Sequence, residues 1–599
     1  MCGLAAILNY DGSPVNDRNL LDMRDLMVHR GPDGTGLWLS PDRAVGLAHR
    51  RLAIVGLGDS GAQPMSSSDG SCHIVFNGEI YNYRELRTFL RSKGVTFRSS
   101  SDTEVLLYLY REEGERMLSR LRGMYAFVIW DSLRQRLFAA RDPFGIKPLY
   151  YADDGRSVYF ASQVKAVLKN PRVDDSPEPA GIVGFLALGY VPEPFTLYRA
   201  ISPVPPGARI SIYRDGRRSV AHFCRLEEEL ANAERNPADR RRDGPQYHLR
   251  VRESLRDSVA AHCIADVPVA LFLSAGLDSG AMAGLAAETG QRLSTLTVGF
   301  EELRGGPNDE TEPAILTARR FATDHHTSWV SINDFEKDLD RIFAAMDQPS
   351  IDGVNTWFVS KAAHQLGIKA ALSGLGGDEL FGTYSSFRDI PRIVGLLGKL
   401  PITTLGAAFR RLSSPVLGKL HSEKAAAILE YGNSYPRAYY LRRALFMPWE
   451  LKTLLPREMA REGWQRLNLF ERMEQTVAAL RSPRLKVSAL EMTWYMRNQL
   501  LRDADWAGMA HSVEIRVPFV DLQVLRSLSP LLAVRPLDGK KVLARVPAKG
   551  LPSEVEHRDK TGFLTPLHKW IAASGSQSRP RDGNRAWALR LAREFKIAA

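Results

Sequence analysis

Short apolar runs separated by turns dominate residues 1–165. Runs of this length, bounded by turn residues, predict strands; they are GLAAILNY, CHIVFNGEI, MYAFVIWD, RLFAARD and SVYFAS. Two amphipathic stretches, near 83–93 and 103–112, predict helices. Because few helices interrupt these strands, we expect stacked antiparallel sheets with the helices on the outside.

A different pattern begins after an irregular stretch, rich in Pro, Arg and Glu, at about 170–245. The predicted strands are then VPVALFLS, LSTLTVGF, HHTSWVSI and IKAALSG, and the predicted helices are 246–263, 279–289, 310–322, 334–346 and 356–366. This alternation predicts a doubly wound parallel sheet, whose ligands bind beyond the carboxyl ends of its strands. Residues 387–535 are expected to be mainly helical, and the last twenty-five residues to be poorly ordered.

Length and composition indicate at least two domains and favour a reducing cytoplasm. A chain of 599 residues exceeds the roughly 250–300 residues at which a single core stops growing. The apolar run at 181–191 is shorter than the roughly 18 residues that span a membrane, so it predicts a buried helix. Four widely spaced cysteines without a C-x-x-C pair argue against a disulfide framework or a zinc cluster. Since the first ten residues contain no Lys or Arg, we expect no secretory leader.

The formal net charge of +12 raises nucleic acid as a partner. The basic residues are scattered, however, and acids and a proline interrupt their densest run, at 235–244. This run is better interpreted as a solvated linker than as a binding patch, so neither a nucleic acid nor a membrane is expected as a partner.

Cys2 is the first candidate for a catalytic residue. If an aminopeptidase removes Met1, Cys2 carries both a thiol and a free α-amine, and an amine that titrates near ~7.7–8.0 can take the proton of the thiol. Position alone is weak support, because a lone cysteine is more often a small buried hydrophobic residue.

The motifs around Cys2 resemble the glutaminase domain of class II, N-terminal-nucleophile (Ntn) amidotransferases. In chain order they are HRGPDG (29–34), AHRRLAIVG (48–56), GAQPM (61–65), VFNGEIYNY (75–83), SSDTEVLL (100–107) and ARDPFGIKPLYY (140–151). The resemblance implies a four-layer αββα sandwich in which Cys2 attacks the carboxamide of glutamine. Asn77 and the Gly78 amide would then stabilise the oxyanion.

The resemblance also implies a glutamine site formed by Arg51, Ile54, Asn77, Glu79 and Asp102. Arg51 would bind the α-carboxylate of glutamine, and Asp102 its α-ammonium. Purely structural roles remain open for single residues: Arg51 as a surface charge, Asn77-Gly78 as a hairpin turn and Asp102 as a helix cap. Gln163 departs from the family pattern ASE-x-KA, which has a glutamate at that position.

A small-residue loop, SAGLDSG (274–280), follows the first predicted strand of the second part and leads into a helix. Such a loop predicts a pyrophosphate site, because backbone amides and the helix N-terminus both attract an anion. It is not a Walker loop. It resembles the S-G-G-x-D-S loop of ATP pyrophosphatases, with Ala275 in place of the first glycine; a capped strand-to-helix turn is the alternative. Alanine fits there only if its φ is negative.

A second loop, ALSGLGGDELFG (371–382), follows another strand of the same predicted sheet. Magnesium bound to ATP needs hard oxygen ligands, for which Asp278 and Asp378 are the candidates. The predicted ATP-binding residues are Ser274, Gly276, Asp278, Ser279, Val298, Ser373 and Gly374, the backbones of Val298 and Gly374 being assigned to adenine by the resemblance.

Two further stretches, at 499–521 and 551–570, resemble the asparagine-synthetase family. Lys560, in R-x-K-x-G-F, is the candidate cation that stabilises the departing pyrophosphate; an ordinary surface lysine is the alternative. The resemblance covers nearly the whole chain. We therefore expect a glutaminase domain at 2–210, a linker at 211–245, a doubly wound synthetase domain with helical additions at 246–575, and a tail at 576–599.

The resemblance implies that glutamine-derived ammonia amidates an acyl-adenylate, with ATP and Mg²⁺ as cofactors. Aspartate, giving asparagine, AMP and pyrophosphate, is the first acceptor considered. In typical asparagine synthetases the motif S-G-E-G-x-D-E has a glutamate tied to aspartate, and Leu375 stands in its place here. One alternative is that the enzyme amidates a different small carboxylate. The other is that the protein keeps the fold of the family but catalyses no reaction. A homodimer is one assembly that the resemblance allows.

Overall fold

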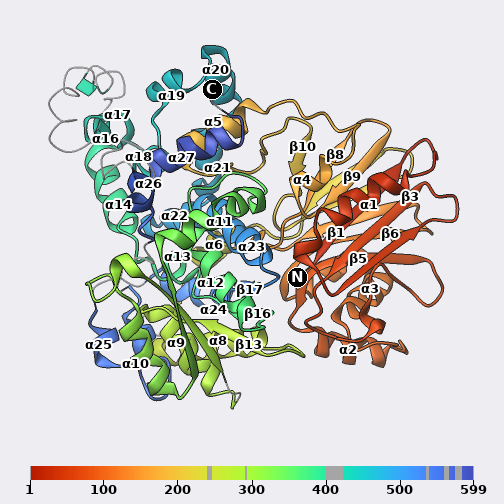
Figure 1. The fold of residues 1–599 in the computed structure, drawn as a ribbon, viewed down its shortest axis with the longest axis horizontal. Coiled ribbons are helices and arrows are strands. Elements are labelled where there is room, and N and C mark those ends of the chain that lie inside the picture. The colour runs from red at the N-terminus through yellow and green to blue at the C-terminus, as the bar shows by residue number, and fades with distance from the viewer. Residues whose placement is uncertain are drawn as a thin grey trace.

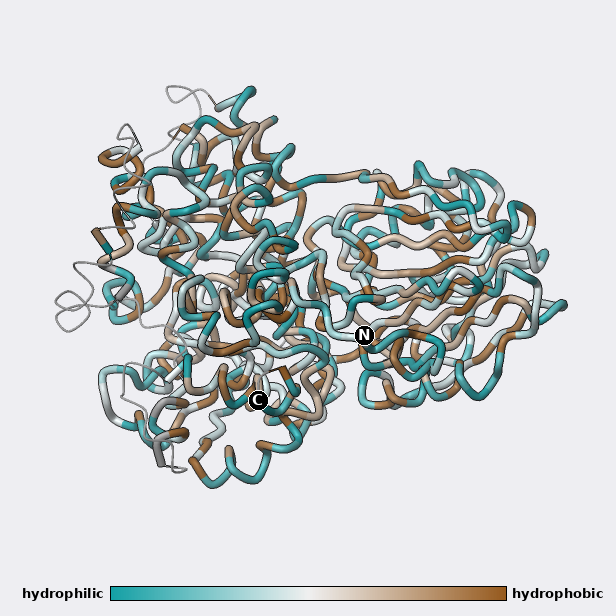
Figure 2. The backbone as a smooth tube through the Cα atoms, turned by 90° about the horizontal axis from the view of Figure 1, so that it is seen from above, coloured by the Kyte–Doolittle hydropathy of each residue, from teal (hydrophilic) through white to brown (hydrophobic). Residues whose placement is uncertain are grey.

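The computed structural model describes residues 2–238, 246–290, 293–398, 406, 409–410, 423–534, 539–558, 565–573 and 583–597. Two lobes lie side by side in Figure 1, an N-terminal lobe drawn in red to yellow and a larger lobe drawn in yellow-green to blue. Figure 2 shows the same two lobes from above, with hydrophobic segments concentrated along the strands of the N-terminal lobe.

The N-terminal lobe contains two six-stranded sheets. The first has the order β10-β8-β9-β1-β3-β2 and the second β12-β11-β7-β6-β5-β4, and all strand pairs in both are antiparallel. The strands are β1 (Gly3–Asn9), β2 (Gly34–Leu39), β3 (Val45–Arg51), β4 (Met65–Ser66), β5 (Cys72–Ile80), β6 (Gly123–Asp131), β7 (Arg136–Arg141), β8 (Tyr150–Asp153), β9 (Ser157–Ala161), β10 (Ile201–Pro203), β11 (Ala208–Tyr213) and β12 (Arg218–His222).

Both faces of each sheet are covered at its centre, which explains why central strands such as β1 and β6 are nearly continuous apolar runs. Leu4, Ala6 and Leu8 of β1 join the core between the sheets, whereas Ala5 and Ile7 join the core on the outer side. Helices α1 (Asp17–Asp25) and α4 (Val164–Val167) cover the first sheet, and α2 (Tyr83–Ser92) and α3 (Asp102–Glu113) cover the second. The predicted αββα sandwich is thereby confirmed.

The larger lobe is built on a five-stranded parallel sheet with the order β15-β14-β13-β16-β17. Its strands are β13 (Val269–Phe272), β14 (Ser294–Phe300), β15 (Asp324–Val330), β16 (Ala370–Leu372) and β17 (Glu514–Arg516). The strand order reverses between β13 and β16, which is where a doubly wound sheet binds its ligand. Both predicted loops, at 274–280 and 371–382, follow these two strands.

Helices surround this sheet and extend beyond it. Those before and around the sheet are α5 (Pro179–Leu188), α6 (Leu226–Arg235), α8 (Tyr247–His262), α9 (Leu277–Ala287), α10 (Thr311–Phe321), α11 (Ile332–Ala345), α12 (Val354–Gln365) and α13 (Gly377–Phe381). The later helices are α14 (Ser386–Leu397), α16 (Glu423–Ala426), α17 (Ile428–Tyr431), α18 (Tyr435–Arg443), α19 (Pro448–Leu454), α20 (Arg457–Leu467), α21 (Leu469–Val477), α22 (Pro483–Leu490), the π-helix η5 (Glu491–Leu501), α23 (Arg502–Met509), α24 (Leu522–Leu532), α25 (Ser553–Glu556), α26 (Leu567–Ala573) and α27 (Gly583–Glu594). Short 3₁₀ helices are η1 (Val28–Arg30), η2 (Asp59–Gly61), η3 (Gly114–Ser119), η4 (Glu301–Leu303) and η6 (Lys541–Arg545).

Three stretches differ from the expectation. Apart from the predicted buried helix at 181–191, which is α5, the region 170–245 was expected to be irregular, but it contains strands β10, β11 and β12 and helix α6. Strand β17 interrupts the predicted helical region, since it adds to the edge of the parallel sheet. The last residues hold α27, because Trp587 is buried and stacks on Phe343 at a ring distance of 5.5 Å.

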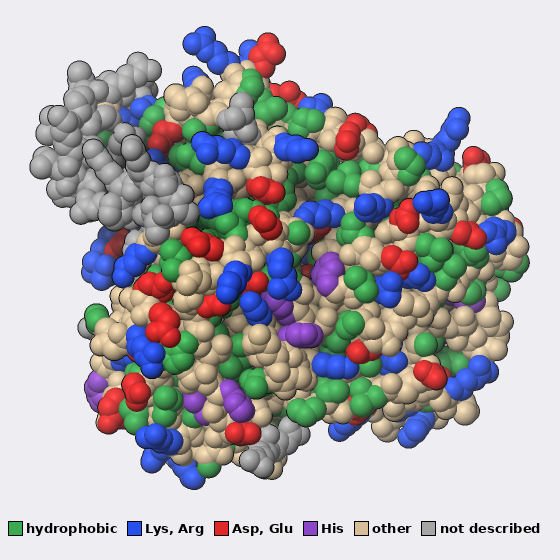
Figure 3. Space-filling model, viewed as in Figure 1, with side chains coloured by type: hydrophobic (Ala, Val, Ile, Leu, Met, Phe, Trp, Pro, Cys, Tyr) green, Lys and Arg blue, Asp and Glu red, His purple; other side chains and the backbone are tan. Residues whose placement is uncertain are grey.

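The expected linker, residues 211–245, also contains regular secondary structure. Strand β11 crosses residue 210 and pairs with β7 of the second sheet, and Leu226 and Leu230 of α6 join a core that includes Leu525 of α24. Of the helices that the structure describes, none combines the length and the hydropathy required to cross a bilayer. On the face shown in Figure 3, Lys and Arg side chains are interspersed with Asp and Glu.

Buried polar contacts join the two lobes close to the N-terminus, which lies where they meet in both ribbon views (Figures 1 and 2). Arg30 forms a bidentate ion pair with Asp505 of α23, at 2.7 and 3.0 Å. The carboxylate of Asp347 accepts the backbone amides of Val164 and Lys165, at 2.8 and 3.0 Å. Arg30 also donates to the carbonyl of Cys2, so the residue before β1 is linked to the second lobe through Arg30.

Candidate active sites

Cys2 lies directly before β1 at this junction, and only 7% of it is exposed. Its backbone nitrogen donates to Asn77 Oδ1 at 2.9 Å, and its carbonyl accepts from Arg30 Nε at 3.1 Å. Burial raises the pKa of the Cys2 thiol, although the Leu52 amide and Arg51 act in the opposite direction. A thiol with a raised pKa needs a base to become a nucleophile.

Asn77 and Gly78 lie in β5, next to Cys2. Asn77 is fully buried, and its Nδ2 has no partner among the described residues, so this donor is available to a ligand. Gly78 has φ = +152°, and a Cβ at this position would overlap the carbonyl oxygen of Met124. Only glycine lets the backbone of β5 lie this close to β6 and orient the Gly78 amide as it does.

The other predicted glutamine-binding residues lie around the same strand ends. Arg51 donates to the carbonyl of Gly58 at 3.0 Å and also to Gly56, so it holds the loop after β3 in place. Ile54, in that loop, is 1% exposed. Glu79 is buried, and burial raises its pKa well above the usual value, while Arg516 of β17 lies 3.4 Å away and acts against the rise.

Asp102 is not the cap of α3. The N-cap is Ser101, whose Oγ accepts the Thr103 amide at 3.1 Å. Asp102 Oδ2 accepts the amide of Ile80, at the end of β5, at 3.0 Å. Burial raises the pKa of Asp102 to about 6. This carboxyl is still mostly ionised at neutral pH, so it can accept a cationic group when a ligand binds.

Gln163, the departure from the family pattern, lies between the lobes. It is 3% exposed, and its Oε1 is buried without a partner in the part of the chain that the structure describes. It lines a small cavity together with Arg30, Asp347, Arg502 and Asp505. The amide therefore faces the polar junction that separates Cys2 from the second lobe.

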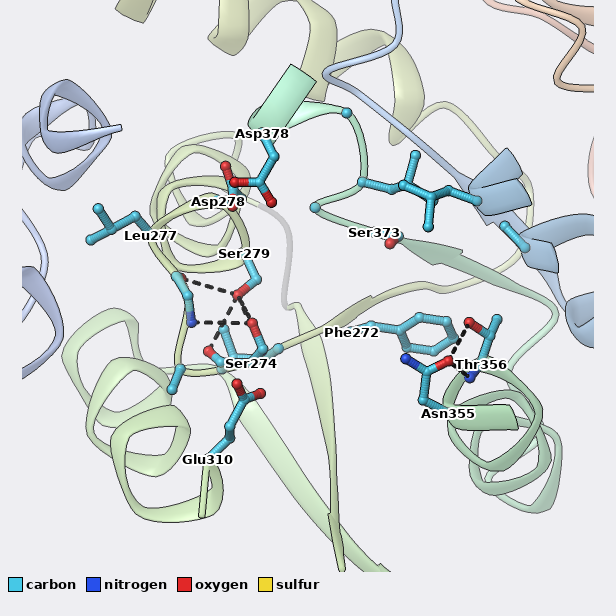
Figure 4. A pocket seen from close by; sticks show the side chains of 18 of the residues that line it. Phe272, Ser274, Leu277, Asp278, Ser279, Glu310, Asn355, Thr356, Ser373 and Asp378 are labelled. Carbon is cyan, nitrogen blue, oxygen red and sulfur yellow. Dashed lines mark hydrogen bonds between the residues drawn. The ribbon is translucent and has the colours of Figure 1, made fainter. Parts of the chain in front are cut away.

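The loops after β13 and β16 enclose a cavity of about 660 Å³. It is lined by every residue predicted to bind ATP, namely Ser274, Gly276, Asp278, Ser279, Val298, Ser373 and Gly374. Figure 4 shows the two loops facing each other across this cavity. Two predicted loops about 100 residues apart in the sequence therefore line the same cavity.

Hydrogen bonds within the first loop hold it in shape. The hydroxyls of Ser274 and Ser279 lie 2.9 Å apart, and Ser274 Oγ accepts the Gly276 amide at 3.1 Å. Helix α9 begins at Leu277, and its first residues line the cavity, so the N-terminal end of the helix is directed toward the predicted phosphate site. Ala275 is not among the residues with positive φ, which meets the condition that its replacement of glycine imposes.

Asp278 and Asp378, the predicted magnesium ligands, come together in the cavity (Figure 4). Both contact the ammonium of Lys540, Asp378 at 2.6 Å. A Cβ on Gly377 would overlap Asp278 Oδ1, so the glycine makes room for this carboxylate. Two carboxylates beside an anion loop form a donor set that fits Mg²⁺ bound to phosphates.

Lys540 also lines this cavity, and it is not among the residues that the sequence predicted. Burial lowers its pKa, but Asp278 and Asp378 outweigh this effect and hold the pKa above its usual value. Its only sequence signal is the doublet Lys540-Lys541 after a glycine, which matches none of the motifs considered. Lys560, which the sequence proposed, lies outside the described residues.

Comparisons with known proteins agree with this architecture. A family model described as a glutamine amidotransferase domain matches residues 1–223, and one described as asparagine synthase matches residues 250–585. The chain is 32% identical over 581 residues to the glutamine-hydrolyzing asparagine synthetase 1 of Bacillus subtilis (strain 168), with 95% of this chain and 88% of that protein covered. It is 34% identical over 597 residues to a putative glutamine-hydrolyzing asparagine synthetase of Mycobacterium bovis, covering 96% and 89%.

A relative with a different name is the amidase chry2 of Gibberella zeae, 34% identical over 433 residues, covering 65% of this chain and 60% of that protein. The fold and the two sites define a glutamine amidotransferase of the Ntn type joined to an ATP-using synthase domain. The chain belongs to the glutamine-hydrolysing asparagine synthase family, whose members are ligases that form a carbon–nitrogen bond.

Proposed function

We propose that this protein hydrolyses glutamine at Cys2 and uses the ammonia to amidate a carboxylate that it has activated as an acyl-adenylate. The observation that carries the proposal is the joint presence of two equipped sites, one around Cys2 and Asn77 and one around Asp278 and Asp378, in lobes joined by buried contacts. Four free thiols accord with the reducing cytoplasm in which we expect it to act.

In the first site, removal of Met1 gives Cys2 an α-amine that takes the thiol proton. The thiolate attacks the carboxamide carbon of glutamine, and Asn77 Nδ2 and the Gly78 amide donate to the oxyanion. The amine returns the proton to the departing nitrogen, so that ammonia leaves and a glutamyl thioester remains. Water then hydrolyses the thioester to glutamate. Arg51 and Asp102 orient glutamine through its two charged α-substituents.

In the second site, an acceptor carboxylate attacks the α-phosphorus of ATP and pyrophosphate leaves. Asp278 and Asp378 would hold Mg²⁺, which supplies positive charge to the phosphates when bound. Lys540, and Lys560 by resemblance, would stabilise the negative charge of the departing pyrophosphate. Ammonia then attacks the acyl carbon and AMP departs, giving the carboxamide and one proton.

Two acceptors fit this scheme. Aspartate is the acceptor that the names of the relatives, asparagine synthetases, suggest, and it would give asparagine. A different carboxylate is favoured by Leu375, because a leucine cannot pair with a polar substituent of the acceptor and leaving such a group unpaired costs roughly 1–3 kcal/mol. Glutamine, ATP and a small carboxylate are the partners in either case.

Cys2→Ala tests the proposal. We expect this variant to lose glutamine-dependent pyrophosphate release and to keep release with added ammonium, because the adenylation site does not contain the thiol. Cys72→Ala, which removes another buried thiol of the same lobe, should keep both activities. Loss of the ammonium-dependent activity in a folded Cys2→Ala protein would contradict two separate sites.

A further inference from the structure

A second group of residues lines the same cavity as the predicted ATP site and differs from it in chemistry. Its apolar members are Leu375, Leu500, Ala504 and Ile515, its acidic members are Asp352, Glu379 and Asp503, and Tyr384 and Tyr495 complete it. These residues are not used by the nucleotide scheme above. They are therefore available to recognise the acceptor.

Glu379 is buried with one carboxylate oxygen unused. It is 0% exposed; Oε1 accepts from the Tyr384 hydroxyl at 2.9 Å, and Oε2 has no partner among the described residues. Burial, together with the charge of Asp378, raises its pKa to about 7. A buried acceptor that no protein donor satisfies is costly unless a ligand supplies the donor.

Asp503 and Asp352 form a second acidic pair in this wall. Asp503 accepts from Ser350 Oγ and from Trp506 Nε1, each at 2.7 Å, which fixes its carboxylate. Burial and the neighbouring charge of Asp352 raise its pKa to about 8. Burial raises the pKa of Tyr495, and the charges of Asp352 and Glu379 add to this rise, so these two acids lie near its hydroxyl. Three acids in one wall favour a cationic ligand.

Among the described residues, the cations that line the cavity are Lys540, Lys541 and Arg558. Lys540 binds Asp278 and Asp378, Arg558 donates to the carbonyls of Pro307 and Asp309 at 2.9 Å each, and Lys541 is exposed. Arg443, behind the two tyrosines, pairs with Glu491 at 2.7 Å. No described cation therefore stands beside Leu375 to pair with a second carboxylate of an acceptor.

We propose that the acceptor is an amino acid with a single carboxylate, which binds with its ammonium facing Glu379, Asp352 and Asp503 and its hydrocarbon part against Leu375 and Leu500. This inference rests on the proposed function and narrows its substrate class. Aspartate fits less well, because its second carboxylate would lie among three acids with no described cation to balance it.

Three acids that differ by one group at a time test the inference. With Mg-ATP and ammonium, β-alanine, which is aspartate without its α-carboxylate, should give a kcat/KM for pyrophosphate release at least about tenfold above that of aspartate. Succinate, which is aspartate without its amine, should give less than either. A higher kcat/KM for aspartate or for succinate than for β-alanine would overturn the inference but leave the proposed function intact. Absence of pyrophosphate release with every carboxylate would instead contradict the proposed function.

Two substitutions separate the role of the apolar residues in the cavity lining from the role of the acidic ones. Leu375→Lys should shift the ratio of kcat/KM values toward aspartate by about tenfold or more, because a cation then stands beside the second carboxylate of aspartate. Glu379→Gln should raise KM for β-alanine and leave KM for ATP unchanged, whereas Glu474→Gln, an exposed position in the same lobe, should change neither. An unchanged acceptor preference in Leu375→Lys, or an equal rise of both KM values in Glu379→Gln, would overturn the assignment.

Discussion

Under the proposed role of Asp102, which is to bind the ammonium of glutamine, its burial predicts a pH dependence of glutamine use. Its carboxyl must be ionised to bind the ammonium of glutamine, and burial raises its pKa to about 6. The carboxylate is present above that value and is lost as the pH falls through it. We therefore expect kcat/KM for glutamine, which reports the free enzyme, to fall below about pH 6 with the slope of one proton.

Asp102→Asn supplies the control for this pH dependence. The variant should lose about 10- to 100-fold in kcat/KM for glutamine, since a charge-assisted hydrogen bond contributes about 1.5–3 kcal/mol, and it should lose the decline near pH 6. Ammonium-dependent pyrophosphate release should not change. A wild-type profile that stays flat down to pH 5 would show that Asp102 does not bind the ammonium.

Lys540 provides a test of the synthetase site at the scale of one side chain. Its ammonium bridges Asp278 and Asp378, so Lys540→Met removes a positive charge at the predicted phosphate site. We expect pyrophosphate release to fall by about 10²–10³-fold, the usual effect of removing one stabilising donor, and glutaminase activity to persist. Lys549→Met, at an exposed position, serves as the control; equal activity in the two variants would exclude Lys540 from the reaction.

Lys560→Ala tests the cation that the sequence itself proposed. We expect this variant to stop pyrophosphate release while glutamine is still hydrolysed, because the lysine is assigned only to the leaving pyrophosphate. Both products are measured in the same assay, as glutamate and as pyrophosphate. Normal pyrophosphate release would remove Lys560 from the mechanism.

Several candidate residues that the structure places beside Cys2 or in the cavity sit in short motifs. Asn77 and Gly78 were found because a tight backbone approach requires a glycine and leaves a recognisable pair, and Asp278 because it belongs to a small-residue loop. Lys540 and the partnership of Arg30 with Asp505 were not found. These contacts join residues 262 and 475 positions apart, and neither partner is constrained by its own neighbours in the chain.

At the scale of elements, one nearly continuous helical run connects the two sites. Helix α22, the π-helix η5 and α23 follow one another without a break from Pro483 to Met509. Tyr495 in η5 and Asp503 in α23 line the synthetase cavity, and Asp505 in α23 pairs with Arg30, which also holds the carbonyl of Cys2. π-helices are rare in proteins, and those that do occur are frequently found at functional sites.

This connection predicts that the ion pair between the lobes couples the two activities. Asp505→Asn leaves the buried guanidinium of Arg30 without its charged partner, which is strongly destabilising. We expect a lower melting temperature and a ratio of glutamate to pyrophosphate that rises above the ratio of the wild type. Asp17→Asn breaks an exposed pair with Arg43 and should change neither value.

The opposite outcome for Asp505→Asn is equally informative. If the folded variant kept the wild-type ratio of glutamate to pyrophosphate, the ion pair would stabilise the junction without coupling the sites. Surface pairs such as that of Asp17 contribute little because water screens them, so the comparison isolates the buried pair.

Elements with a clear pattern of hydrophobic residues were predicted well, whereas elements that depend on tertiary contacts were not. Strands β1, β5 and β6 are continuous apolar runs because both of their faces are buried, and helices α8 to α12 have clear limits. Strand β17 has three residues and exists because Ala370 to Leu372 of β16 pair with it. Helix α27 is amphipathic only weakly, and the burial of Trp587 against Phe343 fixes it.

At the scale of the whole molecule, the arrangement places Cys2, the proposed nucleophile, at the junction of two lobes. Cys2 is held by Asn77 of its own lobe and, through Arg30, by Asp505 of the other. The cavity lined by Gln163 and Arg30 lies at the same junction. Because ammonia in water would be largely protonated and unreactive, transfer inside the molecule favours the amide product.

The most direct test follows nitrogen from glutamine to product. The enzyme is given glutamine with a ¹⁵N amide, Mg-ATP, the acceptor acid and an equal concentration of unlabelled ammonium, and the amide product is examined by mass spectrometry. Transfer within the molecule predicts a product that contains almost only ¹⁵N. A product whose label is diluted in proportion to the ammonium in solution would show that ammonia leaves the protein before it reacts.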